Sequence, residues 1–149
     1  MDSPRHTLYH QGSKAPRLVA AFAPVSAELD VIARNVVDSA FAVHQALGPG
    51  LLESVYETCL AHEIRKRQLG VETQVKFPIV YDGLQLETGL RVDLLVAGQL
   101  VVEVKAVETM LPVFEAQLLT YLKLTQMRLG LLINFNVPRI KDGIKRLVL

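Results

Sequence analysis

The pattern of apolar and polar positions begins with two helical segments. Apolar residues recur at helical spacing from Ser26, whose hydroxyl suits a helix N-cap, until the Gly-Pro-Gly run at 48–50 ends the segment. A second helix is predicted from about Leu52 to Leu69, closed by Gly70. Residues 1–25 show no clear period and contain three prolines, so we expect a flexible leader ahead of a domain at 26–149.

After Gly70 the pattern changes to that of strands. Two strands are predicted at 71–81 and 84–96, joined by a turn at Asp82-Gly83, and Pro78 favours an edge or a bulge in the first. The remaining predicted elements are a strand at 100–106, a helix from Pro112 to about Gln126, and strands at 131–135 and 144–149. This order predicts an α/β fold with one mixed sheet flanked by helices, in which the strand after the third helix returns parallel.

Charged residues interrupt the apolar runs of the second and third predicted strands. Asp93 lies in the second run, while Glu103 and Lys105 lie in the third and point to the same face. If residues 97–99 form a three-residue loop, Val96 pairs with Leu100 and Asp93 lies opposite Glu103. A two-residue loop would instead place the two acids on opposite faces.

Two facing carboxylates repel, and a divalent cation would turn that repulsion into attraction. Mg²⁺ favours one or two carboxylates together with water and phosphate oxygens. Lys105 beside such an ion could orient water or neutralise charge that develops on a phosphate. The alternative is an ordinary solvated face of a sheet, on which alternating charges are common.

Composition narrows the function classes. The chain has 149 residues, of which 50% are hydrophobic and 21% charged, so it is typical of a globular protein. A net charge of +1 excludes a strongly basic coat, so contact with nucleic acid must come from local clusters such as Arg65-Lys66-Arg67. Cys59 is the single cysteine, which excludes an intramolecular disulfide and a cysteine zinc cage. No apolar run has the length of a membrane span, and we expect a cytoplasmic location without membrane contact.

Four blocks of residues together carry a resemblance to a known family. Residues 50–56 have the pattern GxxExxY, and Asp93, the Glu103-Val104-Lys105 run, and Gln117 with Tyr121 follow in that order. Over roughly residues 28–149 the chain resembles the GxxExxY family of the PD-(D/E)XK nuclease-like superfamily. One position departs from the superfamily pattern, because Val92 precedes Asp93 where the name-giving proline would stand.

The resemblance implies an αβββαβ core, like that of restriction endonucleases, and a role for each site residue. Asp93 and Glu103 would be metal-binding acids, Lys105 the catalytic lysine, and the Val104 carbonyl a further ligand. The other residues that it implies are Glu53, a helix acid that completes the metal shell and takes part in catalysis, and three supporting residues, Tyr56, Gln117 and Tyr121.

The residues alone leave other roles open for the helix positions. Glu53 suits the first turn of a helix on electrostatic grounds, and Tyr56 and Tyr121 could be core aromatics with one bonded hydroxyl. Gln117 and Tyr121 are four residues apart, so they share one helix face whichever role they have.

The function that this pattern favours is a Mg²⁺-dependent nuclease, with Mn²⁺ as a substitute ion. It would hydrolyse phosphodiester bonds in DNA or RNA through metal-activated water, and a homodimer would suit the cutting of two strands. The alternative is a nuclease-fold module that binds nucleic acid or protein without cleaving it. A structural oligomer with a solvated charged face is a third hypothesis, and it predicts no affinity for either ion.

Overall fold

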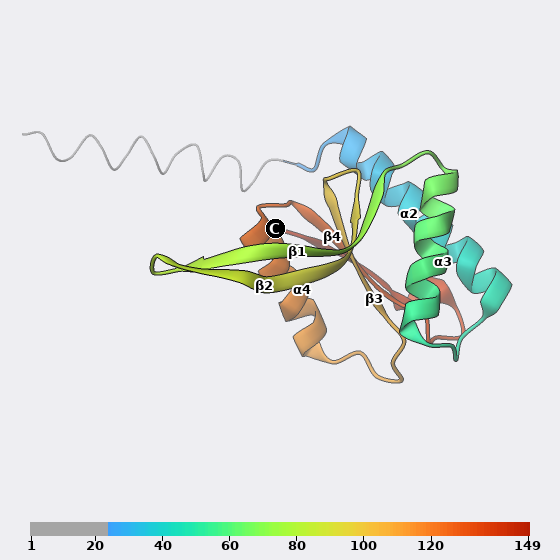
Figure 1. The fold of residues 1–149 in the computed structure, drawn as a ribbon. Helices are drawn as coiled ribbons and strands as arrows, with labels where there is room; N and C mark the ends of the chain where they lie inside the picture. The colour runs from blue at the N-terminus through green and yellow to red at the C-terminus, as the bar shows by residue number, and fades with distance from the viewer. Residues whose placement is uncertain (1–23) are drawn as a thin grey trace, which may run out of the picture.

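The structure, a computed structural model, describes residues 24–149, so residues 1–23 of the predicted leader lie outside the described part. Two helices come first, α2 (Ala27–Leu47) and α3 (Glu53–Lys66), and they pack side by side (Figure 1). Ser26 caps α2 as predicted, because its Oγ accepts a hydrogen bond from the Leu29 N–H at 3.1 Å. Within residues 24–149, no helix combines the length and apolar character that crossing a membrane requires.

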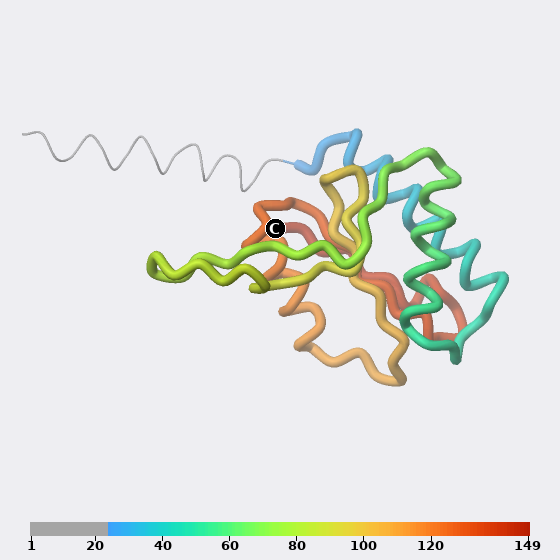
Figure 2. The backbone as a smooth tube through the Cα atoms, viewed as in Figure 1, coloured from blue at the N-terminus to red at the C-terminus, as the bar shows by residue number. Residues whose placement is uncertain are grey.

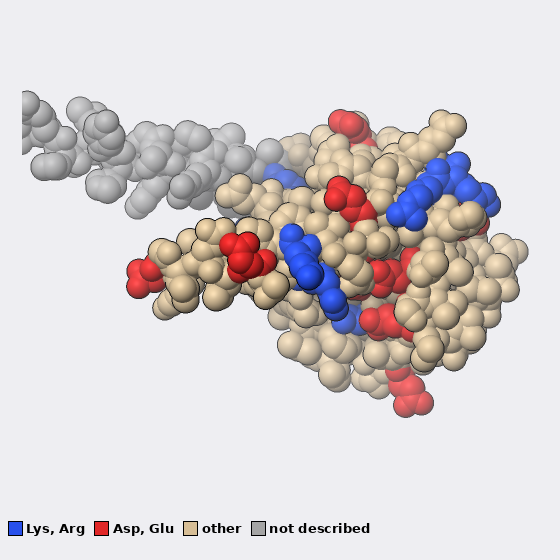
Figure 3. All heavy atoms as spheres, viewed as in Figure 1, with Lys and Arg blue, Asp and Glu red and all other residues tan. Residues whose placement is uncertain are grey.

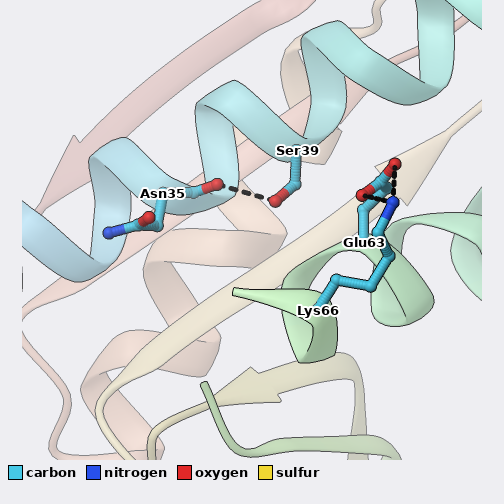
Figure 4. Close-up of polar contacts among 4 residues, drawn as sticks. All are labelled: Asn35, Ser39, Glu63 and Lys66. Atoms are coloured by element: carbon cyan, nitrogen blue, oxygen red, sulfur yellow. Dashed lines mark hydrogen bonds and ion pairs between the residues drawn. The ribbon is translucent and has the colours of Figure 1, made fainter. Parts of the chain in front are cut away.

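Two of the polar contacts on these helices are local. The buried Ser39 hydroxyl donates to the carbonyl oxygen of Asn35 at 2.7 Å, one turn earlier on α2. Lys66 pairs with Glu63 on the surface of α3, with Nζ 3.2 Å from Oε2 (Figure 4). Ser39 therefore needs no partner on another element, and Lys66 already has an acidic neighbour.

The second helix is shorter than predicted. It ends at Lys66, not near Leu69, and Gly70 does not close it. Gln68 adopts the left-handed backbone instead, with φ at 63°. The early stop allows Leu69 to leave the helix and pack against the core. A tertiary contact has overridden the local preference for glycine at a helix end.

Five strands form one sheet in the order β1-β2-β3-β4-β5. The strands are β1 (Val71–Tyr81), β2 (Leu84–Val96), β3 (Leu100–Lys105), β4 (Leu129–Asn134) and β5 (Ile144–Val148). Neighbours are antiparallel except β3 and β4, which run parallel because α4 (Pro112–Thr125) connects them as a crossover. A short 3₁₀ helix, η1 (Ile140–Gly143), leads into β5. The predicted mixed sheet is confirmed.

The sheet lies between two helical layers, with α2 and α3 on one side and α4 on the other (Figure 1). Alternate residues of β3 divide between the layers: Val102 and Val104 join the core under α2 and α3, whereas Val101 packs in the core under α4. This alternation is interrupted on β2. Val92 belongs to the core under α4, whereas Leu94, two residues later, belongs to the core under α2 and α3. Positions two apart normally share a face, so β2 twists between these residues, at Asp93.

The first two strands extend beyond the body of the domain as a two-stranded ribbon (Figure 2). Asp82 and Gly83 form its predicted turn, and both have positive φ, as a tight hairpin turn of this kind requires. The irregularity expected at Pro78 is present, because the pairing register shifts between Phe77 and Ile79. The ribbon therefore places the outer half of β2 well away from the helices, while its base leads directly to Asp93.

Candidate functional site

The loop between β2 and β3 sets the register of the two acidic strands. Val96 pairs with Leu100, so residues 97–99 form the predicted three-residue loop. Ala97 and Gly98 both adopt left-handed backbone, with φ of 51° and 65°. Pairing continues to Leu94 and Val102, and the next position on each strand is Asp93 and Glu103. The sequence-based register is therefore confirmed, and the two acids meet.

At Asp93 and Glu103, hydrogen bonds to side chains replace the backbone–backbone hydrogen bonds that join β2 and β3 elsewhere. The Asp93 N–H donates to Glu103 Oε1 at 3.2 Å, and the Val104 N–H donates to Asp93 Oδ2 at 2.9 Å. Each carboxylate thus accepts a hydrogen bond from the backbone of the opposite strand. This exchange fixes both carboxyl groups at the point where β2 and β3 cease to pair.

Glu103 is in an environment that disfavours its charge. Its side chain is 5% exposed, and this burial is the main cause that raises its pKa to about 9. The nearby negative charge of Asp93 raises it further, while the positive charge of Lys105 lowers it. Without a cation, Glu103 is therefore protonated at neutral pH. A cation between the two acids would favour its ionised form.

Lys105 lies beside the acids with its side chain held by an aromatic ring. Its Nζ is 4.6 Å from the centroid of the Phe114 ring, a cation–π contact with the first turns of α4. Its backbone oxygen accepts from the Phe135 N–H at 2.9 Å and so faces β4. Neighbouring residues of a strand present their backbone groups to opposite sides. The carbonyl of Val104 therefore faces β2, the side on which the Asp93 carboxylate lies.

Helix α4 supplies a wall to the same region. Gln117 Nε2 donates to the Tyr121 hydroxyl at 3.0 Å, so the predicted pair is formed. Burial is the main cause that raises the pKa of Tyr121, and the charge of Glu103 is the next. Tyr121 therefore lies within electrostatic range of Glu103.

Comparison with known proteins agrees with this geometry. Residues 30–147 match the family model of the PD-(D/E)XK nuclease superfamily. The chain belongs to this superfamily. No curated protein and no solved structure matches it. Val92, at the position of the name-giving proline, is fully buried in the core under α4. An apolar residue there keeps the strand packed, so the absence of proline leaves the position of Asp93 intact.

A hydrogen-bonded chain that sequence reasoning missed links α3 to Asp93. Gln74 Nε2 donates to Glu57 Oε1 at 2.6 Å and to Asp93 Oδ1 at 3.4 Å. Burial raises the pKa of Glu57, the hydrogen bond from Gln74 lowers it, and the charge of Asp93 raises it again. Gln74 has a φ of 53°, an uncommon conformation within a strand for a residue other than glycine.

The predicted helix acid lies one turn away from this chain. Glu53 is the first residue of α3 and is exposed. Its charge contributes a minor part of the raised pKa of Glu57, but the Glu53 side chain makes no hydrogen bond or ion pair with residues 24–149. Glu57 is thus the α3 acid that the structure connects to Asp93. Its spacing of four residues from Glu53 is the signal that could have pointed to it.

Tyr56 lies apart from the acids, and its contacts are with the core and with the loop before α3. It is completely buried, and its ring stacks on Phe135 with centroids 4.6 Å apart. Its hydroxyl donates to the Gly48 carbonyl at 2.5 Å and accepts from the Leu51 N–H at 3.1 Å. The final residue of the GxxExxY pattern thus closes the loop between α2 and α3, and its bonds do not extend to the carboxylates.

The donor set fits a hard divalent cation of the kind that superfamily members typically use. Asp93 and Glu103 offer carboxylate oxygens and Val104 offers a carbonyl, all at the place where β2 and β3 separate. Within residues 24–149, no group of three or more His, Cys, Asp or Glu side chains is arranged to hold a metal. Two carboxylates with water and phosphate oxygens are the ligands that Mg²⁺ favours, whereas a soft metal would need nitrogen or sulfur.

Proposed function

We propose that this protein is a nuclease of the GxxExxY type that hydrolyses phosphodiester bonds in nucleic acid with Mg²⁺ or Mn²⁺. The observation that carries the proposal is the juxtaposition of Asp93 with a buried Glu103, beside Lys105. Two carboxylates in such contact, one of them desolvated, destabilise the fold unless a proton or a cation compensates them. A purely structural role would not require this arrangement.

Asp93, Glu103 and the Val104 carbonyl would hold the ion. When bound, the ion would polarise the scissile phosphate and lower the pKa of a water molecule. The carboxylates of Asp93 and Glu103 accept hydrogen bonds from backbone N–H groups, which hold them in place. They would therefore need little rearrangement to bind the ion. On α4, Gln117 donates a hydrogen bond to the Tyr121 hydroxyl and so restricts it.

Lys105 would stabilise negative charge that develops on the phosphate in the transition state. Its ammonium group is compact and strongly hydrated when free. The contact with the Phe114 ring restricts it next to the acids. A charge that is already oriented stabilises a transition state at less entropic cost than one that must be ordered during the reaction.

The decisive experiment is a cleavage assay with Lys105→Ala. The full chain is incubated at low salt with labelled single-stranded DNA, duplex DNA, branched DNA and RNA, in Mg²⁺, Mn²⁺ or EDTA. We expect metal-dependent cleavage by the parent and by Lys123→Ala, which removes an exposed lysine of α4, and almost none by Lys105→Ala. Cleavage by Lys105→Ala at the parent rate would disprove the role of the lysine.

Metal binding is measured separately, because it distinguishes the nuclease from other functions. Isothermal titration with Mn²⁺ should show affinity that falls sharply in Asp93→Asn and is retained in Lys105→Ala. Retained metal binding with no cleavage of any substrate would favour the alternative, a nuclease-fold module that binds without cutting. No affinity for Mg²⁺ or Mn²⁺ would support a structural role instead.

A further inference from the structure

A polar cavity lies at the base of the β1–β2 ribbon, next to the acidic site. Its volume is about 400 Å³. The cavity is lined by Lys76, Thr88, Gly89, Leu90, Arg91 and Tyr121. Tyr121 is also the residue that lies within electrostatic range of Glu103. The cavity therefore has in its lining a residue that Glu103 influences electrostatically.

Two positive charges face each other across this cavity wall. Lys76 on β1 pairs directly with Arg91 on β2, and both side chains are exposed. Like charges directly opposite each other destabilise an antiparallel pair of strands. Of the ion pairs formed among residues 24–149, none includes either residue. The arrangement suits an anion that bridges the two side chains.

Several other basic residues are already paired with acids. Lys145 pairs with Glu115, and Arg146 pairs with Asp30. In the Arg65-Lys66-Arg67 run, Lys66 pairs with Glu63. Figure 3 shows Lys and Arg side chains gathered over the base of the ribbon, directly beside Asp and Glu side chains. Lys76 and Arg91, by contrast, form no ion pair within residues 24–149, and Arg91 lies two residues before Asp93 in the sequence.

The local backbone maintains the shape of the cavity. The register shift between Phe77 and Ile79 leaves a bulge in β2 opposite Pro78, and Gly89 lies in this bulge. A Cβ atom at Gly89 would lie 2.2 Å from Ile79 Cγ1, which is too close for any other residue without rearrangement. The bulge thus allows Ile79 to cross over Gly89 while Thr88 and Leu90 border the cavity.

We propose that Lys76 and Arg91, with the Tyr121 hydroxyl, form a subsite for a backbone phosphate of nucleic acid next to the scissile phosphate. Arg91 precedes Asp93 by two residues, which is about 7 Å along a strand and within the reach of one nucleotide. The guanidinium of Arg91 can bind two phosphate oxygens at once, and Lys76 adds a second charge. The substrate strand would then run along the base of the ribbon towards Asp93. This inference rests on the proposed function for the identity of the neighbouring scissile phosphate, but its binding claim stands alone.

The test measures binding in EDTA, where cleavage does not interfere. Fluorescently labelled single-stranded DNA and RNA oligonucleotides are titrated with the full chain over a series of salt concentrations. Each phosphate contact on a single strand contributes about 0.7 to the slope of log affinity against log salt. The double variant Lys76→Gln/Arg91→Gln removes one or two contacts, so we expect a loss of about 5- to 25-fold at 0.1 M salt and a slope shallower by about 0.7–1.4.

The matched control is Lys66→Gln/Arg67→Gln, which removes the same charge at the C-terminal end of α3. We expect its affinity to change less than twofold and its slope to stay the same. Arg91→Lys should retain more affinity than Arg91→Gln. Thermal unfolding of each variant checks the fold, and relief of the like-charge pair should leave the double variant at least as stable as the parent.

The outcomes separate this subsite from the nuclease function. An equal loss in both double variants, or no loss in either, would overturn the subsite even if the parent cleaves nucleic acid. A selective loss in Lys76→Gln/Arg91→Gln supports the subsite even if no cleavage is found, and in that case only the proposed function fails. Equally tight binding of polyglutamate through the same two residues would overturn nucleic acid as the ligand class.

Discussion

Glu103→Gln tests the electrostatic reasoning on which the site rests. Glu103 has a pKa of about 9 in the folded state, raised from the ordinary 4.5 by burial and by Asp93. Between about pH 4.5 and pH 9, Glu103 keeps its proton in the folded chain but has lost it in the unfolded chain. The free energy of unfolding therefore decreases as the pH rises. The stabilising contribution is complete below about pH 4.5 and is lost as the pH rises through about 9.

The size of this effect follows from the shift. One pKa unit corresponds to about 1.4 kcal/mol, so the interval from pH 5 to pH 8 corresponds to at most about 4 kcal/mol. Local relaxation and water entry reduce this to an expected loss of about 2–4 kcal/mol in the metal-free protein. Glutamine at position 103 does not titrate, so the variant lacks this part of the pH dependence. At pH 8 without metal, Glu103→Gln should therefore be the more stable protein.

The assay is urea unfolding from pH 5 to pH 8 in EDTA at constant ionic strength. Glu108→Gln is the control, because Glu108 is an exposed acid shortly after β3. The control should follow the wild-type curve, whereas Glu103→Gln should diverge from it steadily as the pH rises. Adding Mn²⁺ at pH 8 should stabilise the wild type and leave Glu103→Gln unchanged. Parallel curves for the wild type and Glu103→Gln in EDTA would refute the reasoning.

Three further predictions concern single positions. Tyr56→Phe removes the two hydrogen bonds of the Tyr56 hydroxyl, one to the Gly48 carbonyl and one from the Leu51 N–H. Since each contributes about 0.5–1.5 kcal/mol, the free energy of unfolding should fall by about 1–3 kcal/mol while the cleavage rate of folded protein stays the same; an unchanged urea midpoint would contradict this. Gly143→Ala places a Cβ 2.1 Å from a backbone oxygen and should cost about 1–3 kcal/mol, whereas Gly70→Ala, with open space around it, should lie within about 0.5 kcal/mol of the wild type. Glu57→Gln should weaken Mn²⁺ affinity about 10-fold or more, because Glu57 supports Asp93 through Gln74. Glu53→Gln should weaken it less, and the reverse order in calorimetry would restore Glu53 as the helix acid of the site.

The sequence was sufficient where local chemistry decides the structure. The loop at 97–99 fixed the register of β2 and β3, because a change of one residue would have moved Asp93 to the other face. Ser26 and Pro78 also behaved as predicted, since a cap and a missing backbone N–H act on their immediate neighbours. The fold class followed from the order of these elements, which allows few arrangements.

Long-range packing explains what the sequence did not predict. Gln74 lies opposite the site because β1 adopts a left-handed residue there, and no local signal favours glutamine in that conformation. Glu57 joins the site only because α3 packs over the sheet near this residue. The pairing of Lys76 with Arg91 likewise depends on the register of two strands whose connecting turn lies far from the acids.

The short loop at 97–99 also predicts an order of events when the chain folds. Asp93 and Glu103 are ten residues apart, and hairpins of this kind form in roughly 1–10 μs. The parallel pairing of β3 with β4 must wait for the whole α4 crossover. We therefore expect the two carboxylates to meet first in water, where their repulsion is weak, and to lose that water only when α4 and β4 dock. Alkaline pH should then slow the late docking step and leave formation of the hairpin almost unchanged.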